Sequence, residues 1–318
     1  MAIKSAQFIV EDLLQRANIA INGERPEDIR VHNEQLYPTV VKTGALGFGE
    51  AYVDRWWDCE RLDILFENIS RAQLYNRINQ DWRRWLKVAL ARFHNPQSKR
   101  KAPEVAKKHY DLGNNLFQAM LDPRMNYSCG YWHQAKTLEE AQHAKLKLIC
   151  KKLKLSPGMK LLDIGCGFGG LAKYAALHHD VHVIGINLSK EQVRYAQEYC
   201  LGLPIEIRLQ DYRNFNETVD RIVSVGMFEH VGFQNYRHFM QVAHRCLKPD
   251  GLFLLHTIGN NLTYYAVDEW ISTYIFPNGM LPSISLIGKA IEDLFIMEDW
   301  HNFGADYDKT LMSWQQQF

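Results

Sequence analysis

Asp163-Ile-Gly165-Cys-Gly167-Phe-Gly169-Gly170, residues 163–170, is the stretch of the chain that decides the fold. It follows a short apolar run at 160–164 and precedes a run at 171–177 with the apolar spacing of a helix. Glycines at a strand-to-helix turn let the backbone bend sharply and approach a ligand closely. Dinucleotide-binding enzymes use the spacing G-x-G-x-x-G, whereas the even spacing here favours a ligand without a phosphate group. The alternative is a tight turn with a purely structural role.

Strand and helix patterns alternate on both sides of this turn. Upstream, Thr137 and Glu140 have capping-box spacing and open a helix that Ser156-Pro157-Gly158 closes. Downstream, Ser189 and Gln192 cap a helix, and we predict a further helix around 236–246 and strands at 181–186, 205–209, 221–225 and 252–256. Such alternation requires a mostly parallel sheet with helices on both faces. The predicted fold class is therefore α/β, doubly wound and Rossmann-like, with a smaller helical N-terminal domain.

Residues 1–94 form the predicted N-terminal domain. We predict a first helix there, which Asn22-Gly23 is expected to end. The apolar residues that recur in it at helical spacing are Val10, Leu13, Leu14, Ala17 and Ile21. A second helix at 81–94 carries aromatic side chains on one face and basic ones on the other. The polar, basic segment 95–105 contains two prolines and is the predicted linker to a second domain, 106–318.

Composition excludes several classes of protein. The net charge of the 318 residues is +1 at pH 7, which gives no basis for a nucleic-acid-binding surface. The six cysteines lack metal-ligand spacing and indicate free thiols in a reducing compartment, without a metal site. The N-terminus does not have the pattern of a signal peptide, and no run of apolar residues is long enough to span a membrane. We therefore expect a soluble, cytoplasmic protein.

Polar groups follow the carboxyl ends of successive predicted strands, where ligands bind in doubly wound sheets. They are Gly165–Gly170, Asn187, Asp211, Glu229 and His256. Asn187 stands where a ribose-binding carboxylate is expected, and Gln210-Asp211-Tyr212 could bind an adenine ring. From the residues alone, a structural hydrogen bond between Glu229 and His230 is as good an interpretation as a catalytic one. Cys129 taken alone is better explained as a small buried apolar residue.

Longer motifs extend over the chain. They are AINGERPEDIRVHN (20–33), HYDLGNNLFQAMLDPRMNYSCGYW (109–132), LLDIGCGFGGLA (161–172), SVGMFEHVG (224–232), FLLHTIG (253–259) and IFPNGMLPS (275–283), followed by EDWHNFGADY (298–307). With these motifs the chain resembles the cyclopropane-fatty-acyl-phospholipid synthases, which are related to the mycolic acid cyclopropane synthases. The resemblance covers essentially the whole chain and implies a class I methyltransferase that uses S-adenosylmethionine.

The resemblance also implies roles for individual residues. Members of the family transfer a methylene group from S-adenosylmethionine to a cis double bond of a phospholipid acyl chain, and a bound bicarbonate removes a proton from the carbocation. The implied bicarbonate site consists of Cys129, Glu229, His256, Tyr307 and the Ile258 backbone. The implied cofactor contacts are Tyr127, Ser128, Asp163, Gly165, Cys166, Gly167, Gly169, Asn187, Leu188, Gln192, Asp211 and Tyr212. Aromatic rings of Tyr127, Tyr131 and Trp132 are candidates to stabilise the cation.

The same resemblance sets expectations for partners and for the chain's extent. We expect phospholipid acyl chains as substrate, peripheral contact with the inner membrane and a homodimer. The basic helix 81–94 and the run Lys99-Arg100-Lys101 would meet anionic headgroups, although Trp82, Trp85 and Phe93 are slightly better explained as core. Family members continue beyond the position of Phe318, so the resemblance implies a truncated chain and leaves both an active and an inactive form of it as alternatives. The alternative functions are a small-molecule methyltransferase and a non-catalytic lipid-binding protein of the same fold.

Overall fold

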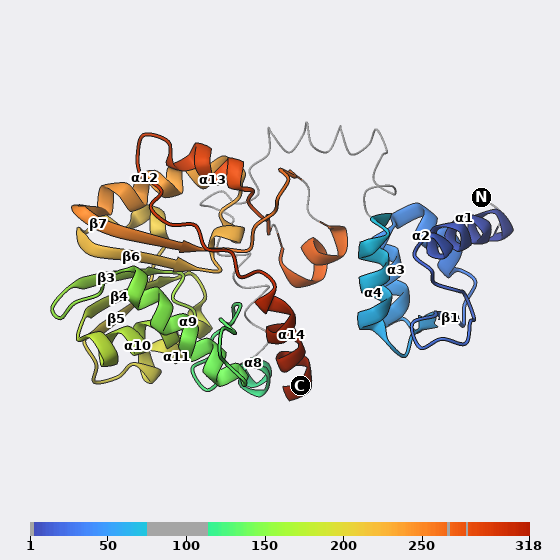
Figure 1. Ribbon diagram of the computed structural model, residues 1–318, viewed down its shortest axis with the longest axis horizontal. Helices are drawn as coiled ribbons and strands as arrows, with labels where there is room; N and C mark the ends of the chain where they lie inside the picture. The colour runs from blue at the N-terminus through green and yellow to red at the C-terminus, as the bar shows by residue number, and fades with distance from the viewer. Residues whose placement is uncertain (1–2, 75–113, 266–267, 278) are drawn as a thin grey trace. The chain divides into compact units, whose positions relative to one another are not determined.

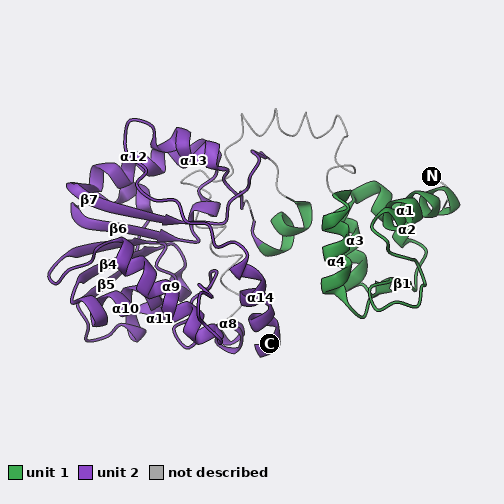
Figure 2. Cartoon of the chain, viewed as in Figure 1, with its two compact units in different colours: residues 1–94, 268–275 green, residues 95–267, 276–318 purple. Residues whose placement is uncertain are grey.

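The computed structural model describes residues 3–74, 114–265, 268–277 and 279–318. The chain divides into two compact units, residues 1–94 with 268–275 and residues 95–267 with 276–318 (Figure 2). The predicted helix 81–94 and the predicted linker 95–105 lie outside the described residues. Among the residues that are described, no helix is both long and apolar enough to cross a bilayer.

Unit 2 is built on a parallel sheet of five strands in the order β5-β4-β3-β6-β7 (Figure 1). The strands are β3 (Lys160–Ile164), β4 (His182–Asn187), β5 (Ile205–Leu209), β6 (Val219–Val225) and β7 (Leu247–His256). All five predicted strands are present, and the doubly wound fold class is confirmed. β6 and β7 begin earlier than predicted because Val219 pairs with Leu247 across a register shift that leaves the polar residues 248–251 without a partner in β6.

Helices cover both faces of this sheet (Figure 1). They are α8 (Asn114–Met120), α9 (Leu138–Lys152), α10 (Gly170–His179), α11 (Lys190–Tyr199), α12 (Tyr236–Cys246), α13 (Ile284–Ile291) and α14 (Asp306–Gln317), with short helical turns η1 (Tyr212–Asn214), η2 (Phe228–His230) and η3 (Phe233–Asn235). Alternate residues of β3 face opposite cores, since Leu161 packs with α9 and α10 while Leu162 packs with α12. The predicted capping box is present, because the Thr137 side chain accepts from Glu140 N–H at the start of α9.

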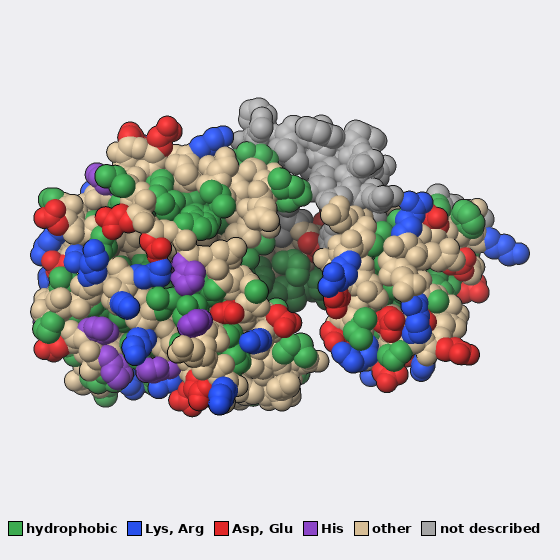
Figure 3. Space-filling model, viewed as in Figure 1, with side chains coloured by type: hydrophobic (Ala, Val, Ile, Leu, Met, Phe, Trp, Pro, Cys, Tyr) green, Lys and Arg blue, Asp and Glu red, His purple; other side chains and the backbone are tan. Residues whose placement is uncertain are grey.

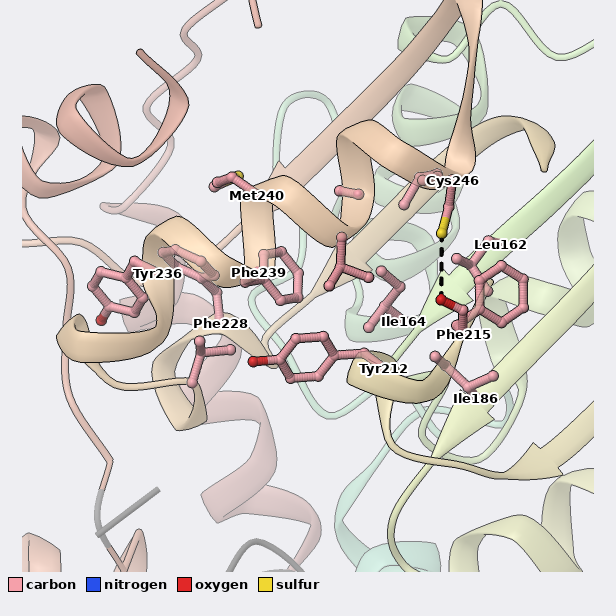
Figure 4. Close-up of a cluster of buried hydrophobic side chains, with 14 of the residues drawn as sticks. Leu162, Ile164, Ile186, Tyr212, Phe215, Phe228, Tyr236, Phe239, Met240 and Cys246 are labelled. Carbon is pink, nitrogen blue, oxygen red and sulfur yellow. Dashed lines mark hydrogen bonds between the residues drawn. The ribbon is translucent and has the colours of Figure 1, made fainter. Parts of the chain in front are cut away.

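An aromatic cluster supports the loop after β6 (Figure 4). The ring of Phe228 stacks on Tyr236 at 4.2 Å between centroids and meets the edge of Phe239 at 5.2 Å. Tyr212 packs edge-on against Phe239 at 5.0 Å. These fully buried rings fix η2, so the residue after Phe228, Glu229, is held on a rigid base rather than on a free loop.

Unit 1 is mainly helical, with a two-stranded antiparallel sheet. Its elements are α1 (Ile3–Arg16), β1 (Arg30–Val31), α2 (Leu36–Thr43), α3 (Ala45–Val53), β2 (Trp57–Asp58), α4 (Leu62–Arg71) and the π-helical turn η4 (Ile271–Ile275). The prediction that the first helix continues to Asn22-Gly23 is wrong. α1 ends at Arg16, because Asn18 adopts a left-handed conformation (φ 56°) and Ile21 instead forms a β-bridge with Ile29.

Residues 268–275 belong to unit 1 although they are distant from it in sequence. The Tyr274 hydroxyl donates to Glu50 Oε1 of α3 at 2.8 Å. A Cβ built on Gly49 would lie 2.4 Å from the Trp270 ring, so the indole packs directly on the α3 backbone. On the face drawn in Figure 3, acidic and basic side chains are interspersed over the described residues of both units.

Candidate active site

A cavity opens at the carboxyl ends of β3, β4 and β6, where the glycine turn follows β3. Gly165 and Gly167 have positive φ values of 84° and 54° and line this cavity. A Cβ on Gly165 would come within 2.7 Å of Met227, and one on Gly167 would meet no atom of the protein within 4 Å. Glycine at position 165 therefore allows close packing against Met227. Glycine at position 167 keeps the positive φ of the backbone and leaves the space beside it open.

Most residues predicted to contact a cofactor line the same cavity. They are Tyr127, Ser128, Asp163, Gly165, Cys166, Gly167, Asn187, Leu188, Gln192 and Tyr212. Gly169 is not among the lining residues: it is the N-cap of α10, and a Cβ there would meet Cys200 Sγ at 3.0 Å. Asp211 is also absent from the lining, because its Oδ1 accepts from the backbone and side-chain N–H groups of Arg213, both at 2.9 Å. The neighbouring Gln210 and Tyr212 line the cavity instead.

Asp163 presents a buried carboxyl group to the cavity. The side chain is 2% exposed, and Oδ2 has no hydrogen-bond partner in the part of the chain that the structure describes. Burial raises the pKa of the Asp163 carboxyl to about 7. A buried acceptor without a donor is unfavourable, so this oxygen suits a ligand that brings its own N–H or O–H group.

Asn187 and Gln192 hold each other at the end of β4. Asn187 Nδ2 donates to Gln192 Oε1 at 2.8 Å, and Asn187 Oδ1 accepts from Leu188 N–H at 2.7 Å. Ser189 Oγ accepts from Gln192 N–H at the start of α11, as predicted. The Asn187 side chain thus shapes the turn that lines the cavity and is already hydrogen-bonded through both of its polar atoms.

Four further predicted site residues come from four separate segments. Glu229 follows β6, His256 ends β7, Cys129 precedes α9 and Tyr307 lies in the first turn of α14. Glu229 Oε1 accepts from Ile258 N–H at 2.8 Å. The carboxyl group of Glu229 and the thiol of Cys129 are both close enough to raise the pKa of Tyr307 electrostatically, after the larger effect of burial. Tyr307 therefore lies near both Glu229, which follows β6, and Cys129 in the loop before α9.

Burial shifts the pKa values of these side chains in the direction that favours their neutral forms. It raises the pKa of the Cys129 thiol to about 11 and lowers the pKa of His256 to about 3. The pKa values of Glu229 and Tyr307 are raised for the same reason. Glu229 Oε2 and His256 Nδ1 are buried without hydrogen-bond partners among the described residues. Glu229 and His256 can therefore each form a further hydrogen bond.

The Ile258 amide differs from its predicted role. We expected this N–H to donate to a bound anion, and the structure instead places it on Glu229 Oε1. The reason is local geometry, since Ile258 lies two residues after the end of β7 and faces the η2 loop that carries Glu229. The amide orients the carboxyl group rather than remaining free for a ligand.

α14 anchors the loop that contains Cys129, and this role was not predicted from the sequence. Thr310 Oγ1, which is fully buried, accepts from Gly130 N–H at 3.0 Å and from Trp132 Nε1 at 2.9 Å. Asp306 Oδ2 accepts from Trp132 N–H at 2.7 Å. The spacing of Asp306 and Thr310, four residues apart on one helical face, was the available signal. Lys145, a lysine in the apolar row of α9, lines the cavity and was missed as well.

The aromatic candidates occupy different surroundings. Trp132 is buried and fixed by Thr310, whereas Tyr131 lies edge-on to Phe303 at 5.5 Å. Phe303 in turn stacks on His256 at 5.3 Å with an interplanar angle of 11°. Tyr127 lines the cavity and lies edge-on to Phe117 at 5.3 Å.

Comparison with known proteins identifies this arrangement. The family model described as mycolic acid cyclopropane synthetase matches residues 97–318. The chain belongs to that family. It is an enzyme with the class I fold of S-adenosylmethionine-dependent methyltransferases.

Individual relatives agree with this assignment. The chain is 56% identical over 310 residues to the cyclopropane-fatty-acyl-phospholipid synthase of Escherichia coli K12, covering 98% of this chain and 81% of that protein. The solved cyclopropane synthase MmaA2 from Mycobacterium tuberculosis aligns with a TM-score of 0.64 at 37% identity, covering 68% of this chain and 82% of the other. A mycolic acid cyclopropane synthase complexed with SAH and CTAB aligns with a TM-score of 0.63 at 37% identity, with the same coverage.

Proposed function

We propose that the chain transfers a methylene group from S-adenosylmethionine to the cis double bond of unsaturated phospholipid acyl chains, forming a cyclopropane ring. Membership of the cyclopropane synthetase family supports the type of reaction. The name of the Escherichia coli relative, which the chain matches over 98% of its length, supports phospholipid acyl chains as the substrate.

The cavity after β3 fits S-adenosylmethionine. Gly165 and Gly167 leave room for a ligand against the backbone, and Asp163 offers a buried acceptor that lacks a donor. Tyr127, Ser128, Gln192 and Tyr212 supply further polar lining. When bound, S-adenosylmethionine supplies a methyl group on a sulfonium sulfur, which is a reactive electrophile.

An alkene is a weak nucleophile, so positioning carries much of the catalysis. The residues that line the cavity would hold S-adenosylmethionine beside the acyl chain, so that its methyl group could pass to the double bond with release of S-adenosylhomocysteine. Positive charge then develops on the neighbouring acyl carbon, where the faces of Tyr127 and Tyr131 can stabilise it. Loss of a proton from the transferred methyl group closes the three-membered ring. Water must be excluded until then, because it would trap the cation.

The proton acceptor in this proposal is a bicarbonate ion held by Cys129, Glu229, His256 and Tyr307. The observation that supports it most is that Glu229 Oε2 and His256 Nδ1 are buried without hydrogen-bond partners among the described residues. The Tyr307 phenol and a neutral His256 imidazole can each donate a hydrogen bond to an anion in a dry site. Ile258 contributes indirectly, by orienting Glu229 through its N–H group.

Membrane attachment and assembly complete the proposal. The substrate lies in a bilayer, so the enzyme must dock peripherally on the inner membrane, and the run Lys99-Arg100-Lys101 supports contact with anionic headgroups. A homodimer is proposed on the basis of the family resemblance alone.

The test uses the full-length protein, S-adenosylmethionine and vesicles of an unsaturated phospholipid. The acyl chains are analysed by mass spectrometry, and vesicles of the saturated lipid are the control. We expect a gain of one CH₂ per modified chain in the unsaturated lipid only. Vesicle binding without product would instead support a lipid-binding protein, and methylation of small amines without a lipid product would support a small-molecule methyltransferase.

A further inference from the structure

The loop between α8 and α9 contains Cys129 and changes its surroundings at that residue. Residues 125–128 of the loop line the cavity after β3, whereas residues 129–132 are not among the lining residues. The Cys129 side chain is buried. The first half of the loop therefore belongs to the cofactor cavity, and the second half does not.

Buried polar side chains hold the first half of the loop, two of them from α9. Gln142 Nε2 donates to Ser128 O at 2.8 Å and to Asn126 O at 3.4 Å. Lys145 Nζ donates to Ser128 Oγ at 2.7 Å. Asp122 Oδ1 accepts from Asn126 N–H at 2.8 Å. Ser128 is also the last residue of the loop that lines the cavity, so these hydrogen bonds fix the half that a cofactor touches.

Side chains of α14 hold the second half of the loop. Thr310 Oγ1 accepts from Gly130 N–H at 3.0 Å and from Trp132 Nε1 at 2.9 Å. Asp306 Oδ2 accepts from the backbone N–H of Trp132 at 2.7 Å. The helix that holds the loop thus changes from α9 to α14 at Cys129, where the lining of the cavity also ends.

The Thr310 hydroxyl has all of its hydrogen-bonding groups in use. A hydroxyl has one hydrogen to donate and two lone pairs to accept with. Thr310 accepts from two groups of the loop and donates its hydrogen to Asp306 O at 2.9 Å. The Cys129 thiol lies 4.0 Å from Thr310 Oγ1 and has a closer acceptor in Gly130 O, at 3.3 Å. Thr310 therefore acts on Cys129 mainly through the backbone of Gly130.

Close packing makes this support rigid. A Cβ built on Gly130 would lie 3.0 Å from Ala141 Cβ of α9 and 3.5 Å from Thr310 Oγ1. Tyr131 N–H donates to Ala141 O at 3.0 Å, between the two groups that Thr310 binds. Thr310 is itself fully buried, so the loss of its hydroxyl would leave two N–H groups without their acceptor in a dry place.

We propose that Thr310 is a positioning residue for Cys129, which holds the second half of the loop independently of the half that lines the cofactor cavity. Its hydroxyl then supports the chemical step without contributing to cofactor affinity. This inference rests on the proposed function, because it takes Cys129 as part of the bicarbonate site.

The first test compares turnover with cofactor affinity in the full-length enzyme. Thr310→Val removes the acceptor at similar volume and leaves the packing of Trp314 on Tyr127 in place. With S-adenosylmethionine and vesicles of an unsaturated phospholipid, kcat should fall about 10- to 100-fold, as expected when a group at a reactive site is displaced. Affinity for S-adenosylhomocysteine, measured by calorimetry, should stay within about twofold. Thr310→Ser keeps the hydroxyl and should restore kcat to within about threefold of the parent value.

Matched variants separate the two halves of the loop. Gln142→Leu removes a donor to the first half, so it should weaken S-adenosylhomocysteine binding about tenfold and keep kcat at saturating cofactor within about threefold. Ser313→Ala is the control on α14, because the Ser313 hydroxyl donates to Lys309 O four residues earlier, as the Thr310 hydroxyl does to Asp306 O. It should leave both quantities unchanged.

Hydrogen exchange tests the support of the loop without measuring turnover. NMR compares the Gly130 amide, bound by Thr310, with the Asn126 amide, bound by Asp122. Thr310→Val should speed exchange at Gly130 by about tenfold or more relative to Asn126. A threonine that only stabilises the fold would instead speed both amides equally, because the whole unit would open together.

Several results would overturn the inference. They are unchanged kcat in Thr310→Val, a parallel loss of kcat and cofactor affinity, equal acceleration of the two amides, failure of Thr310→Ser to restore kcat, and loss of kcat in Gln142→Leu at saturating cofactor. If Thr310→Val does not fold, Asp306→Ala removes the other acceptor of the second half and carries the same predictions, with the Trp132 amide in place of Gly130.

Failure of the proposed function would look different. A parent enzyme that makes no cyclopropane product would contradict that function. The exchange rates of Gly130 and Asn126 would still decide whether α14 holds the second half of the loop by itself.

Discussion

Ionisable side chains at this site are controlled mainly by burial rather than by charged neighbours. Desolvation is the largest cause of the pKa shifts of Cys129, Asp163, Glu229 and His256. A neutral, dry environment suits a reaction in which a carbocation must survive until it loses a proton. Charge is introduced by the ligands and not by the protein, with Lys145 as the main exception.

Asp163→Asn should change the pH dependence of stability in the ligand-free chain. The pKa of Asp163 is raised to about 7 in the folded chain, so the folded state binds this proton more tightly than the unfolded state does. Stability of the parent chain is therefore lost as pH rises from about 4 to about 7. The variant cannot ionise, and thermal unfolding should show it more stable relative to the parent at pH 8 than at pH 5. An equal difference at both pH values would contradict the raised pKa.

Glu229→Gln should reduce turnover in the full-length enzyme by about 10²- to 10³-fold, the usual effect of losing one fixed group at a preorganised anion site. Affinity for S-adenosylhomocysteine should stay within about twofold, since Glu229 is not among the residues lining the cofactor cavity. Steady-state rates and calorimetry on the same sample measure both quantities. Normal turnover with a lowered melting temperature would assign Glu229 a structural role and remove the anion site from the account.

At the scale of single elements, the glycine turn after β3 is the feature that a ligand depends on most. Gly167→Val should abolish binding of S-adenosylhomocysteine by calorimetry, because its side chain would enter the space beside the turn. Gly158→Val is the matched control, because Gly158 also has a positive φ, 79°, and open space around it but precedes the first residue of β3. The Gly158→Val variant should introduce comparable backbone strain and keep the affinity for S-adenosylhomocysteine. Undiminished binding by Gly167→Val would exclude the turn as the ligand site.

The elements of unit 2 were predictable because their patterns are local. The strands at 160–164 and 205–209 and the helix at 236–246 agree with the structure residue for residue. Non-local contacts caused the failures, as in β7, which begins at Leu247 because this residue pairs with Val219 of β6 ahead of the polar residues 248–251. Three features of the site depend on side-chain geometry, which the spacing of residues in the sequence does not encode. They are the hydrogen bond of Arg213 to Asp211, the burial of Lys145 and the anchoring of the Cys129 loop by Thr310.

At the scale of the whole molecule, the account requires an enzyme that reaches a lipid. We predict that residues 1–102 contribute most of the membrane contact, because the sequence there combines basic and aromatic residues at 81–94 and 99–101. Flotation with anionic vesicles should recover the whole chain and leave a fragment of residues 103–318 largely unbound. Neutral vesicles are the control for charge. Equal flotation of the fragment and the whole chain would place the contact in unit 2.

The central claim is that the chain makes a cyclopropane ring by losing a proton from the transferred methyl group. The most direct test gives the full-length protein S-adenosylmethionine with a fully deuterated methyl group and vesicles of an unsaturated phospholipid. Mass spectrometry then counts the deuterium atoms in each modified acyl chain. The account predicts a product that keeps two of the three deuterium atoms and has no remaining double bond. A product that keeps all three would show simple methylation, and unmodified lipid beside consumed cofactor would show that the acyl chain is not the acceptor; either result would contradict the account.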